Sequence, residues 1–283
     1  EDVLEKWVGQ KFDYEILQAN PWTANFVVAN RYVSGRVALA GDAAHQFVPT
    51  GGYGMNIGMA DAAGLAWALA ALVQGWGGAR LLDAYEAERK ATAWWHLRAA
   101  QGHMDVRIKM SELYAEAGDL DGEGPEADAK RAEYGRRIAA LGNAENESWG
   151  VEHGYRYDES PIIVHEPDPP EIDKLTYRPS TWPGARMPHI FLEDGTPIHD
   201  RLGLWFTLVA FAGIDTAALE AAAADQGIPL AVLRLDRPDL RSIYERDLLL
   251  VRPDQHVAWR GDALPEKPAE LLQLVTGGQG GKS

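Results

Sequence analysis

The sequence predicts an α/β protein built in two parts, and three patterns lead to that prediction. A short apolar strand, a glycine-rich loop and a long helix of small residues follow one another over residues 36–74. Prolines crowd the stretch 161–183, where they favour an extended linker over a core element. Beyond this stretch, strand and helix patterns alternate again. We therefore expect a domain boundary near residue 170, with domains at 1–170 and 171–283.

Composition limits the classes of protein and partner that we expect. The 283 residues carry a formal charge of −15, which disfavours contact with nucleic acid or anionic membranes. The sequence has no cysteine, which excludes disulfides and thiolate metal sites, and its eight histidines do not cluster at metal-ligand spacing. We expect no apolar run of transmembrane length, because the longest candidate, Ala60–Val73, is interrupted by Asp61 and Trp67. We therefore expect a cytoplasmic protein that binds no metal, no nucleic acid and no membrane.

The first part contains extended segments followed by helices. Alternating apolar residues predict strands early in the chain, and runs of alanine, glycine and methionine predict buried helices after the glycine-rich loop. The predicted elements are strands within Asp13–Arg31 and at Val37–Ala40, helices at Ile57–Gln74 and from Arg80 to about Met110, a helical excursion over Ser111–Glu147, and a strand at Tyr155–Val164.

The second part alternates strands with helices. An alanine-rich helix separates the first two apolar strands, and three further elements follow. The predicted elements are strands at Leu204–Phe211, Leu230–Leu235, Leu248–Val251 and His256–Trp259, and helices at Thr216–Asp225 and near Ala269.

The loop that follows the first buried strand has the features of a ligand cradle. Gly51, Gly52 and Gly54 allow positive φ angles and let a flat ligand approach the backbone. The helix that starts near Asn56 leaves its first amides unpaired, and its dipole favours a ligand that becomes anionic. The carboxylate of Asp42 suits the hydroxyls of a polyol, as at a nucleotide ribose. In the alternative interpretation, Asp42 caps a turn and the glycines only shape that turn.

This loop resembles a known motif. The residues concerned are Gly41-Asp42-Ala43-Ala44-His45, Pro49, Gly51-Gly52, Gly54-Met55-Asn56 and Asp61-Ala62. Together they resemble the second FAD-binding motif of the flavoprotein aromatic hydroxylases, the family of para-hydroxybenzoate hydroxylase and phenol hydroxylase. The segments Leu65–Ala70 and Asp83–Arg89 are similar to the helical segments that follow in the same family.

The resemblance implies FAD as a cofactor and gives the loop residues their roles. Asp42 would bind the ribityl chain, and the backbone of residues 54–56 would face the pyrimidine edge of the isoalloxazine. The carbonyl of Pro49 would lie near the reacting ring of the substrate, which makes Pro49 the catalytic candidate. The implied cofactor-binding set is Gly41, Asp42, Pro49, Gly51, Gly52, Gly54, Met55 and Asn56, with no metal ligand.

The resemblance also implies a fold. The first part would be the C-terminal part of a FAD-binding Rossmann-like (para-hydroxybenzoate hydroxylase) fold. The second part, through Leu250–Asp254 and Val257–Arg260, resembles the thioredoxin-like α/β domain of the phenol hydroxylase branch. Because the chain has no cysteine, this domain cannot perform dithiol chemistry. We expect it to be structural, or to lie at the subunit interface of a homo-oligomer.

One hallmark of the family is missing from the sequence. The Gly-x-Gly-x-x-Gly turn that holds the ADP part of FAD in the family occurs nowhere in this sequence. The family's Asp-Gly motif near the nicotinamide path is also missing, because Asp194-Gly195 and Asp121-Gly122 are isolated turn dipeptides. The chain therefore resembles the C-terminal half of a longer hydroxylase, and we expect the N-terminal half as its partner. A proteolytic product, a separate piece of one protein and a subunit of a split enzyme all fit the sequence.

The activity implied by the resemblance is hydroxylation of a phenolic or polyketide aromatic substrate. NADPH or NADH would reduce FAD, O₂ would form a flavin C4a-hydroperoxide, and its terminal oxygen would pass to the ring. Two alternatives stay open at this point. One is a non-catalytic fragment or interaction module of a split flavoenzyme, and the other is a flavoenzyme with different chemistry, such as a halogenase or a ring-opening oxygenase.

Three further polar residues have expected roles. We expect His45 to hydrogen-bond the backbone and hold the loop, rather than to relay a proton. We expect Asp61 to be structural, because a carboxylate in the first turns of a helix interacts favourably with the helix dipole. We expect Arg186 to pair with a carboxylate across the domain boundary.

Overall fold

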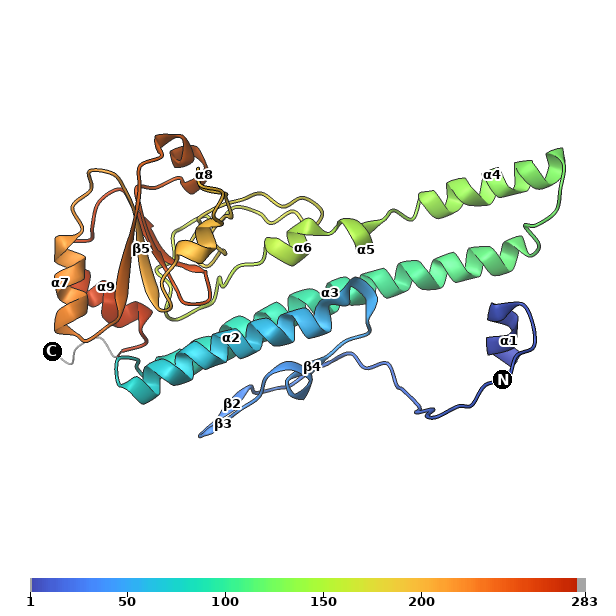
Figure 1. The fold of residues 1–283 in the computed structure, drawn as a ribbon, viewed down its shortest axis with the longest axis horizontal. Helices are drawn as coiled ribbons and strands as arrows, with labels where there is room; N and C mark the ends of the chain where they lie inside the picture. The colour runs from blue at the N-terminus through green and yellow to red at the C-terminus, as the bar shows by residue number, and fades with distance from the viewer. Residues whose placement is uncertain (1, 279–283) are drawn as a thin grey trace.

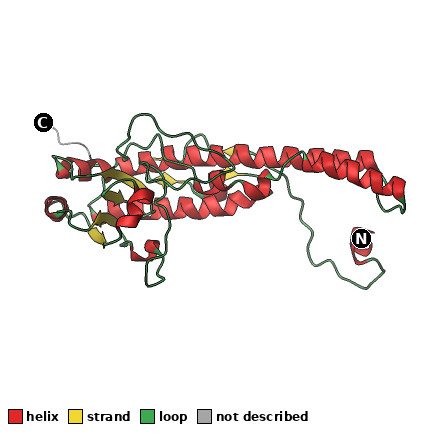
Figure 2. Cartoon of the chain, turned by 90° about the horizontal axis from the view of Figure 1, so that it is seen from above, coloured by secondary structure: helices red, strands yellow, loops and turns green. Residues whose placement is uncertain are grey.

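Two long antiparallel helices form the axis of the molecule, and an α/β unit packs at one end of them (Figure 1). The computed structural model describes residues 2–278. The two helices are α2, Tyr53–Gln74, and α3, Arg80–Ala117. Beyond the start of α2, α3 continues beside α4, Pro125–Ala139, which runs back in the opposite direction. Seen from above, the N-terminal segment leaves this helical body (Figure 2).

Short elements surround the helix pair in the first part of the chain. Strand β1 pairs with β4 and β2 pairs with β3, and both pairs are antiparallel. In chain order the elements are α1 Asp2–Val8, β1 Val27–Val28, β2 Val33–Ser34, β3 Val37–Ala38, the 3₁₀ helix η1 Gly41–Ala43, β4 His45–Gln46, the 3₁₀ helix η2 Thr50–Gly52, and, after α4, α5 Ala144–Glu147 and α6 Trp149–His153.

Both long helices extend further than the sequence indicates. α2 begins at Tyr53 rather than near Asn56, and α3 continues to Ala117 rather than ending near Met110. α4 supports the extension of α3, since Arg137 of α4 forms an ion pair with Glu116 of α3 at 2.7 Å. The predicted helical character of residues 111–147 is confirmed by the end of α3 and by α4 and α5.

The apolar composition of α2 is that of a helix that can cross a membrane. By length and composition, the helical segment Thr50–Gln74 is apolar enough to cross a membrane, so the expectation that no apolar run reaches transmembrane length is wrong. A core helix of a soluble protein passes the same test of length and composition. Inside this segment, Asp61 forms a buried ion pair with Arg89 of α3.

A mixed four-stranded sheet forms the second part, in the order β6-β5-β7-β8. β5 is parallel to β6 and antiparallel to β7, and β7 is antiparallel to β8. This order and these directions confirm the predicted thioredoxin-like arrangement. The elements are η3 Ile198–Arg201, β5 Phe206–Phe211, α7 Ala217–Asp225, β6 Leu230–Leu235, η4 Pro238–Leu240, α8 Arg241–Tyr244, β7 Leu248–Val251, β8 Val257–Gly261 and α9 Pro268–Val275.

The central strand β5 is buried on both faces of the sheet. Successive side chains of a strand point to opposite faces, so Phe206, Leu208 and Ala210 share one face. That face packs against α7 and α9 and also against Trp67 of α2, whose ring centroid lies 6.0 Å from that of Phe206. A single hydrophobic core therefore extends from the long helix into the sheet.

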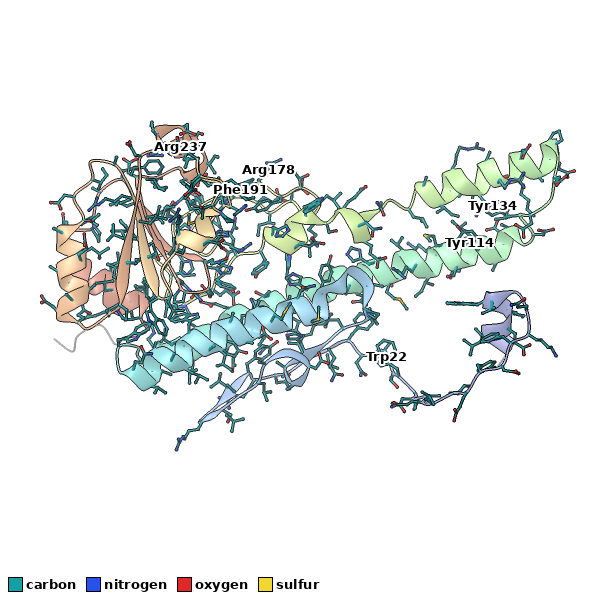
Figure 3. All side chains as sticks on the ribbon, in the orientation of Figure 1. Trp22, Tyr114, Tyr134, Arg178, Phe191 and Arg237 are labelled. Carbon is teal, nitrogen blue, oxygen red and sulfur yellow. The ribbon has the colours of Figure 1, made fainter. Side chains whose placement is uncertain are left out.

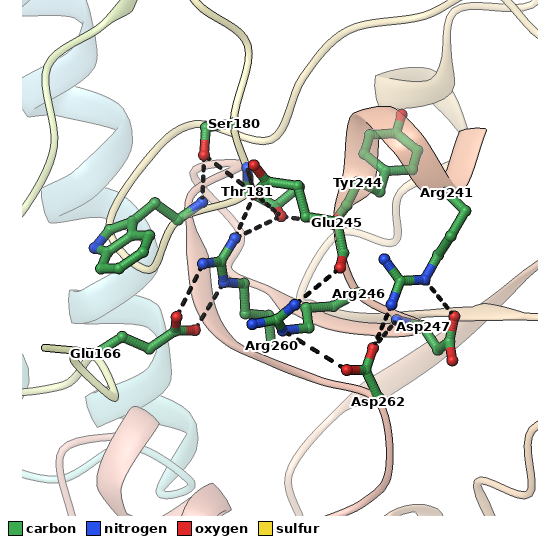
Figure 4. A network of polar contacts seen from close by, with 11 residues as sticks. Glu166, Ser180, Thr181, Arg241, Tyr244, Glu245, Arg246, Asp247, Arg260 and Asp262 are labelled. Atoms are coloured by element: carbon green, nitrogen blue, oxygen red, sulfur yellow. Dashed lines mark hydrogen bonds and ion pairs between the residues drawn. The ribbon is translucent and has the colours of Figure 1, made fainter. Parts of the chain in front are cut away.

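The segment between the two parts contacts the sheet through backbone and polar groups. The amide of Val164 donates to the carbonyl of Ala258 at 2.9 Å. On β8, Arg260 binds both carboxylate oxygens of Glu166 at 2.7 and 2.9 Å, and it also binds Glu245 (Figure 4). Residues 164–166 thus contact the second part, while the boundary near residue 170 stays a prediction.

Two predicted strands are wrong. Of Asp13–Arg31, only Val27–Val28 form a strand among the residues that the structure describes. Trp22 is 68% exposed on the extended segment, away from the helices (Figure 3). Tyr155–Val164 forms turns, with one isolated bridge between Arg156 and Ala185. An apolar pattern indicates burial, but a strand also needs a neighbour that pairs with its backbone.

Candidate functional site

The loop from β3 to α2, together with the first turn of α2, contains all of the predicted cofactor residues. η1, β4 and η2 lie in this loop in succession, and its last glycine is the N-cap of α2. The predicted residues are therefore close in sequence and belong to one short stretch of structure. They are Gly41, Asp42, Pro49, Gly51, Gly52, Gly54, Met55 and Asn56.

Three of these glycines have backbone conformations that other residues rarely adopt. The φ angles are +57° at Gly41, +76° at Gly51 and +69° at Gly52. Gly54 lies in the first turn of α2, so a positive φ angle does not explain it. A Cβ atom added to Gly52 or Gly54 would meet no atom within 4 Å. The surface beside these two glycines is therefore open.

Gly51 faces protein atoms. A Cβ atom added there would lie 2.5 Å from the ring of Tyr53. Its amide donates to Oε1 of Glu145 at 3.1 Å, and Arg107 holds both oxygens of that carboxylate at 2.7 and 2.8 Å. The contact joins the loop to α5. Nothing in the sequence pattern points to Glu145, which lies 94 residues from Gly51.

The outer side of the loop presents its polar groups to solvent. Asp42, Pro49 and Asn56 are exposed, and Met55 is 73% exposed. Gly52, the N-cap of α2, offers no side-chain cap to the first amides of this 22-residue helix. The first turn of a long helix therefore directs uncapped amides and the positive end of its dipole toward an open surface.

The inner side of the loop is held by a buried aspartate. Asp61 has 0% exposure, and its Oδ2 accepts from the Gly41 amide at 3.0 Å and lies 2.7 Å from His45 Nε2. Its Oδ1 accepts from Nε of Arg89 at 2.7 Å. Asp61 is structural as predicted, but it acts through an ion pair rather than the helix dipole. His45 holds the loop as predicted, but its partner is this carboxylate and not the backbone.

The partners of Asp61 keep it ionised. Burial alone raises the pKa of the Asp61 carboxyl, but hydrogen bonds from His45, Arg89 and the Gly41 amide, with the Arg89 charge, lower the pKa below its ordinary value. The pKa of Arg89 is raised well above its ordinary range, despite burial, by Tyr157, Tyr155 and Asp61. The pair is therefore a carboxylate and a guanidinium at neutral pH.

Close packing of the loop on α2 depends on a glycine that sequence reasoning missed. A Cβ atom added to Gly58 would lie 3.2 Å from the Cα of Gly41. At this distance the neighbouring backbone would have to move by a few tenths of an ångström. Gly58 therefore lets η1 lie directly against α2, and the only signal in the sequence is its place among the small residues of the helix.

A neutral histidine packs beneath the loop. The ring of His96, which is 2% exposed, lies 5.1 Å from the ring of Tyr53 in an edge contact, and its Nδ1 bonds the Thr92 carbonyl at 2.8 Å. Burial lowers the pKa of His96 to about 4, because the imidazolium form loses its solvation. The hydroxyl of Tyr53 lies 3.0 Å from Nε2 of a second histidine, His103.

The lowered pKa of His96 predicts that the protein loses stability at a pH above the range in which carboxylates titrate. The unfolded chain binds a proton near pH 6.5 and the folded chain only near pH 4, so stability falls as pH is lowered through that interval. Between pH 7 and pH 5 we expect His96 to lower the free energy of unfolding by about 2 kcal/mol. Urea unfolding at both pH values measures it. His96→Phe should remove this contribution of about 2 kcal/mol, exposed His153→Gln should keep it, and an unchanged profile in His96→Phe contradicts the prediction.

The prediction that Arg186 pairs with a carboxylate across the domain boundary is wrong. Its Nε and Nη2 both donate to Oε1 of Gln255, at 3.0 and 2.6 Å, and Nη2 lies 3.4 Å from Nδ1 of His199. An isolated antiparallel β-bridge joins the backbones of Arg186 and His256, so Arg186 lies beside Gln255. The glutamine oxygen takes the place of the expected carboxylate. Across residues 2–278, no group of three or more histidines and carboxylates is placed to hold a metal ion.

Comparison with known proteins matches both parts of the chain. Residues 1–100 match the family model of a FAD binding domain, and residues 180–277 match that of the aromatic-ring hydroxylase C-terminal domain. The FAD-dependent monooxygenase opdD of Penicillium oxalicum is 37% identical over 270 residues, covering 89% of this chain and 50% of the relative. The 2,4-dichlorophenol 6-monooxygenase of Cupriavidus pinatubonensis is 34% identical over 284 residues, covering 88% and 47%.

A solved structure shares the fold. The structure of RebC-10x, native and with bound K252c, superimposes with a TM-score of 0.86 at 36% identity, covering 98% of this chain and 52% of that chain. The matches on both parts define a FAD-binding protein with an aromatic-ring hydroxylase C-terminal domain. The chain belongs to the FAD-dependent aromatic hydroxylases. It spans about half the length of the curated relatives it matches.

Proposed function

We propose that the protein containing this chain is a monooxygenase that uses FAD, O₂ and NADPH or NADH to hydroxylate a phenolic or polyketide aromatic substrate. The observation that carries this proposal is the loop itself, in which exposed Asp42 lies in η1, η1 packs against α2 at Gly58, and α2 begins without a side-chain cap. The names of the relatives support the substrate class, since one of them is a 2,4-dichlorophenol 6-monooxygenase. We extend the proposal to a cytoplasmic homo-oligomer.

The residues present suit the flavin end of FAD. A flat ring system needs backbone that it can approach closely, and the space beside Gly52 and Gly54 is free of atoms to 4 Å. A ribityl chain needs acceptors for its hydroxyls, and the Asp42 carboxylate is exposed for that contact. Anionic character on a ring edge needs directed donors, which the first turn of α2 supplies.

Bound FAD would supply the redox chemistry, taking electrons from NADPH or NADH and passing one oxygen atom of O₂ to the aromatic ring. The chain's own groups would orient and polarise the reactants. Asp42 would accept hydrogen bonds from the ribityl hydroxyls, and the amides of residues 54–56 would stabilise negative charge on the pyrimidine edge. The Pro49 carbonyl would accept a hydrogen bond from the substrate hydroxyl, which favours phenolate-like character and attack at the ring.

This chain spans about half of the length of its relatives. We propose that the N-terminal half of the whole protein, which is absent from this sequence, binds along α2. The larger exposed side chains of this helix, Met55, Met59, Leu69 and Val73, have helical spacing and share one face. An exposed apolar face of this kind indicates a protein contact. The N-terminal half, in the same chain or in a companion chain, would cover this face and complete the FAD site.

The visible spectrum of the purified protein tests the proposal. We expect flavin absorbance to persist after addition of excess FAD and desalting, once the N-terminal half is present. We then expect a panel of phenols to accelerate NADPH or NADH oxidation and to yield hydroxylated products. A colourless protein in the presence of both halves contradicts the proposal and favours a non-catalytic module.

Replacing Asp42 tests the role assigned to it in FAD binding. Asp42→Ala removes a charged acceptor, and hydrogen bonds to charged groups contribute about 1.5–3 kcal/mol, so we expect Kd for FAD to rise about 10- to 100-fold. Fluorescence titration of FAD into the two-half protein measures this change. Asp225→Ala, at an exposed aspartate of α7, is the control and should leave Kd unchanged. An unaltered Kd in Asp42→Ala removes the ribityl role.

A further inference from the structure

Two adjacent residues of α3 bind opposite parts of the molecule. Arg89 contacts Asp61 behind the cofactor loop, and Glu88 contacts Arg252 at the end of β7. Successive residues of an α-helix point about 100° apart, so neighbours in sequence reach different partners. Both side chains are buried, with 3% exposure at Glu88 and 1% at Arg89. One turn of α3 therefore lies between the cofactor loop and the C-terminal sheet.

On the loop side of this arrangement, Arg89 is held by hydrogen bonds. The Arg89 guanidinium donates from Nε to Asp61 Oδ1 at 2.7 Å and from Nη2 to the carbonyl of Ile57 at 3.2 Å. Asp61 passes the constraint to the loop, since its other oxygen holds the Gly41 amide. The position of Gly41 is thus tied to the position of Arg89.

The sheet side is equally constrained. Arg252 donates from Nη1 and Nη2 to the two oxygens of Glu88 at 2.5 and 2.7 Å, a bidentate pair. Arg252 also binds Asp254 at 2.6 Å, and the hydroxyl of Ser160 donates to Glu88. Arg252 lies 164 residues from Glu88 in sequence, so only the docked C-terminal domain supplies this counter-charge.

Tyr157 joins the two sides. Its hydroxyl accepts from Nη1 of Arg89 at 3.0 Å. Its ring stacks on His256 at 4.1 Å between centroids, and the guanidinium carbon of Arg252 lies 5.2 Å from the ring centroid. Two buried ion pairs, Asp61–Arg89 and Glu88–Arg252, are therefore joined by Tyr157, and we call these five residues the α3 network.

We propose that the α3 network couples the cofactor loop to the C-terminal domain, with Glu88, Arg89, Tyr157 and Arg252 as positioning residues. A buried charge that loses its partner must recover solvation or a proton, and either response shifts the helix that carries it. Loss of Arg252 would leave the buried Glu88 carboxylate without its partner and shift α3. This shift would reach Gly41 through Arg89 and Asp61. A thioredoxin-like domain without cysteine thus has a role in setting loop geometry. The coupling between the loop and the C-terminal domain is independent of the proposed function, whereas its effect on flavin binding rests on the proposed function.

Hydrogen exchange of the Gly41 amide in this chain tests the coupling directly, without FAD. Arg252→Met removes the charge and retains most of the side-chain length, and we expect exchange at Gly41 to accelerate at least about 10-fold. Leu219→Ala creates a cavity in the same domain, at a fully buried residue of α7 outside the α3 network. This control should destabilise the domain and leave Gly41 exchange unchanged. Equal exchange at Gly41 in Arg252→Met and wild type, or equal acceleration in the control, overturns the proposal.

Tyr157→Phe provides a second test if Arg252→Met fails to fold. It deletes only the hydroxyl that accepts from Arg89, and we expect faster exchange at Gly41 with unchanged exchange in β5 and β7. Exchange at Gly41 that stays at the wild-type rate in a folded Tyr157→Phe protein overturns the coupling. In the FAD-loaded two-half protein, the same variant should shift the flavin absorption spectrum and raise Kd for FAD. If no FAD binds at all, the proposed function fails, while the exchange result still decides the coupling.

Discussion

Asp61→Asn is expected to lower the free energy of unfolding by about 3–5 kcal/mol, because it leaves a buried guanidinium without its counter-charge. Asparagine has nearly the same shape, so the loss reports charge and hydrogen bonding rather than a cavity. An amide offers one acceptor oxygen, whereas Asp61 uses both of its oxygens to hold Arg89, His45 and the Gly41 amide. The loop and α3 would both lose their anchor.

Denaturant unfolding at pH 7 measures this loss. Asp225→Asn, at an exposed aspartate, is the matched control and should change stability by less than about 0.5 kcal/mol. The Asp61 contribution also has a defined pH dependence. Its pKa is lowered in the folded state, so the contribution is complete above the ordinary value of 3.8 and is lost as pH falls below it. Equal stability of Asp61→Asn and Asp225→Asn at pH 7 would contradict the role of the ion pair.

Gly78→Ala is expected to produce the second-largest loss of stability, about 3 kcal/mol, at the upper end of the range for overpacking. A Cβ atom added to Gly78 would lie 2.1 Å from the carbonyl oxygen of Gly277, and both are backbone sites that cannot rotate away. The amide of Gly78 also donates to the Thr276 carbonyl at 2.8 Å. The turn between α2 and α3 would have to separate from the end of α9.

Thermal unfolding of Gly78→Ala checks this expectation. Gly102→Ala is the matched control, because Gly102 lies in α3 where an added Cβ meets no atom within 4 Å. Alanine favours a helix over glycine by about 1 kcal/mol, so the control should be slightly more stable than wild type. A melting temperature of Gly78→Ala equal to that of wild type would show that the turn moves without cost.

Local patterns were sufficient for the parts of the fold that depend on neighbours in sequence. The strands β6 and β7 have the predicted bounds, because short runs of apolar residues between turn residues indicate buried strands. The glycine-rich loop also lies between a strand and a helix as its spacing indicates, while the role of Gly41–Asn56 in binding FAD stays a prediction. Where an apolar segment lacked a pairing neighbour, as in Tyr155–Val164, the same method predicted a strand that does not exist.

The sequence by itself determined the α/β class, the glycine-rich loop and the family resemblance, because these follow from spacing within a few tens of residues. The tertiary structure alone decided how the loop is held. Asp61 meets Arg89 across 28 residues, and Glu88 meets Arg252 across 164. Any carboxylate can pair with any guanidinium, so composition cannot select partners. The choice is made by which groups share a buried space, where an unpaired charge costs several kcal/mol.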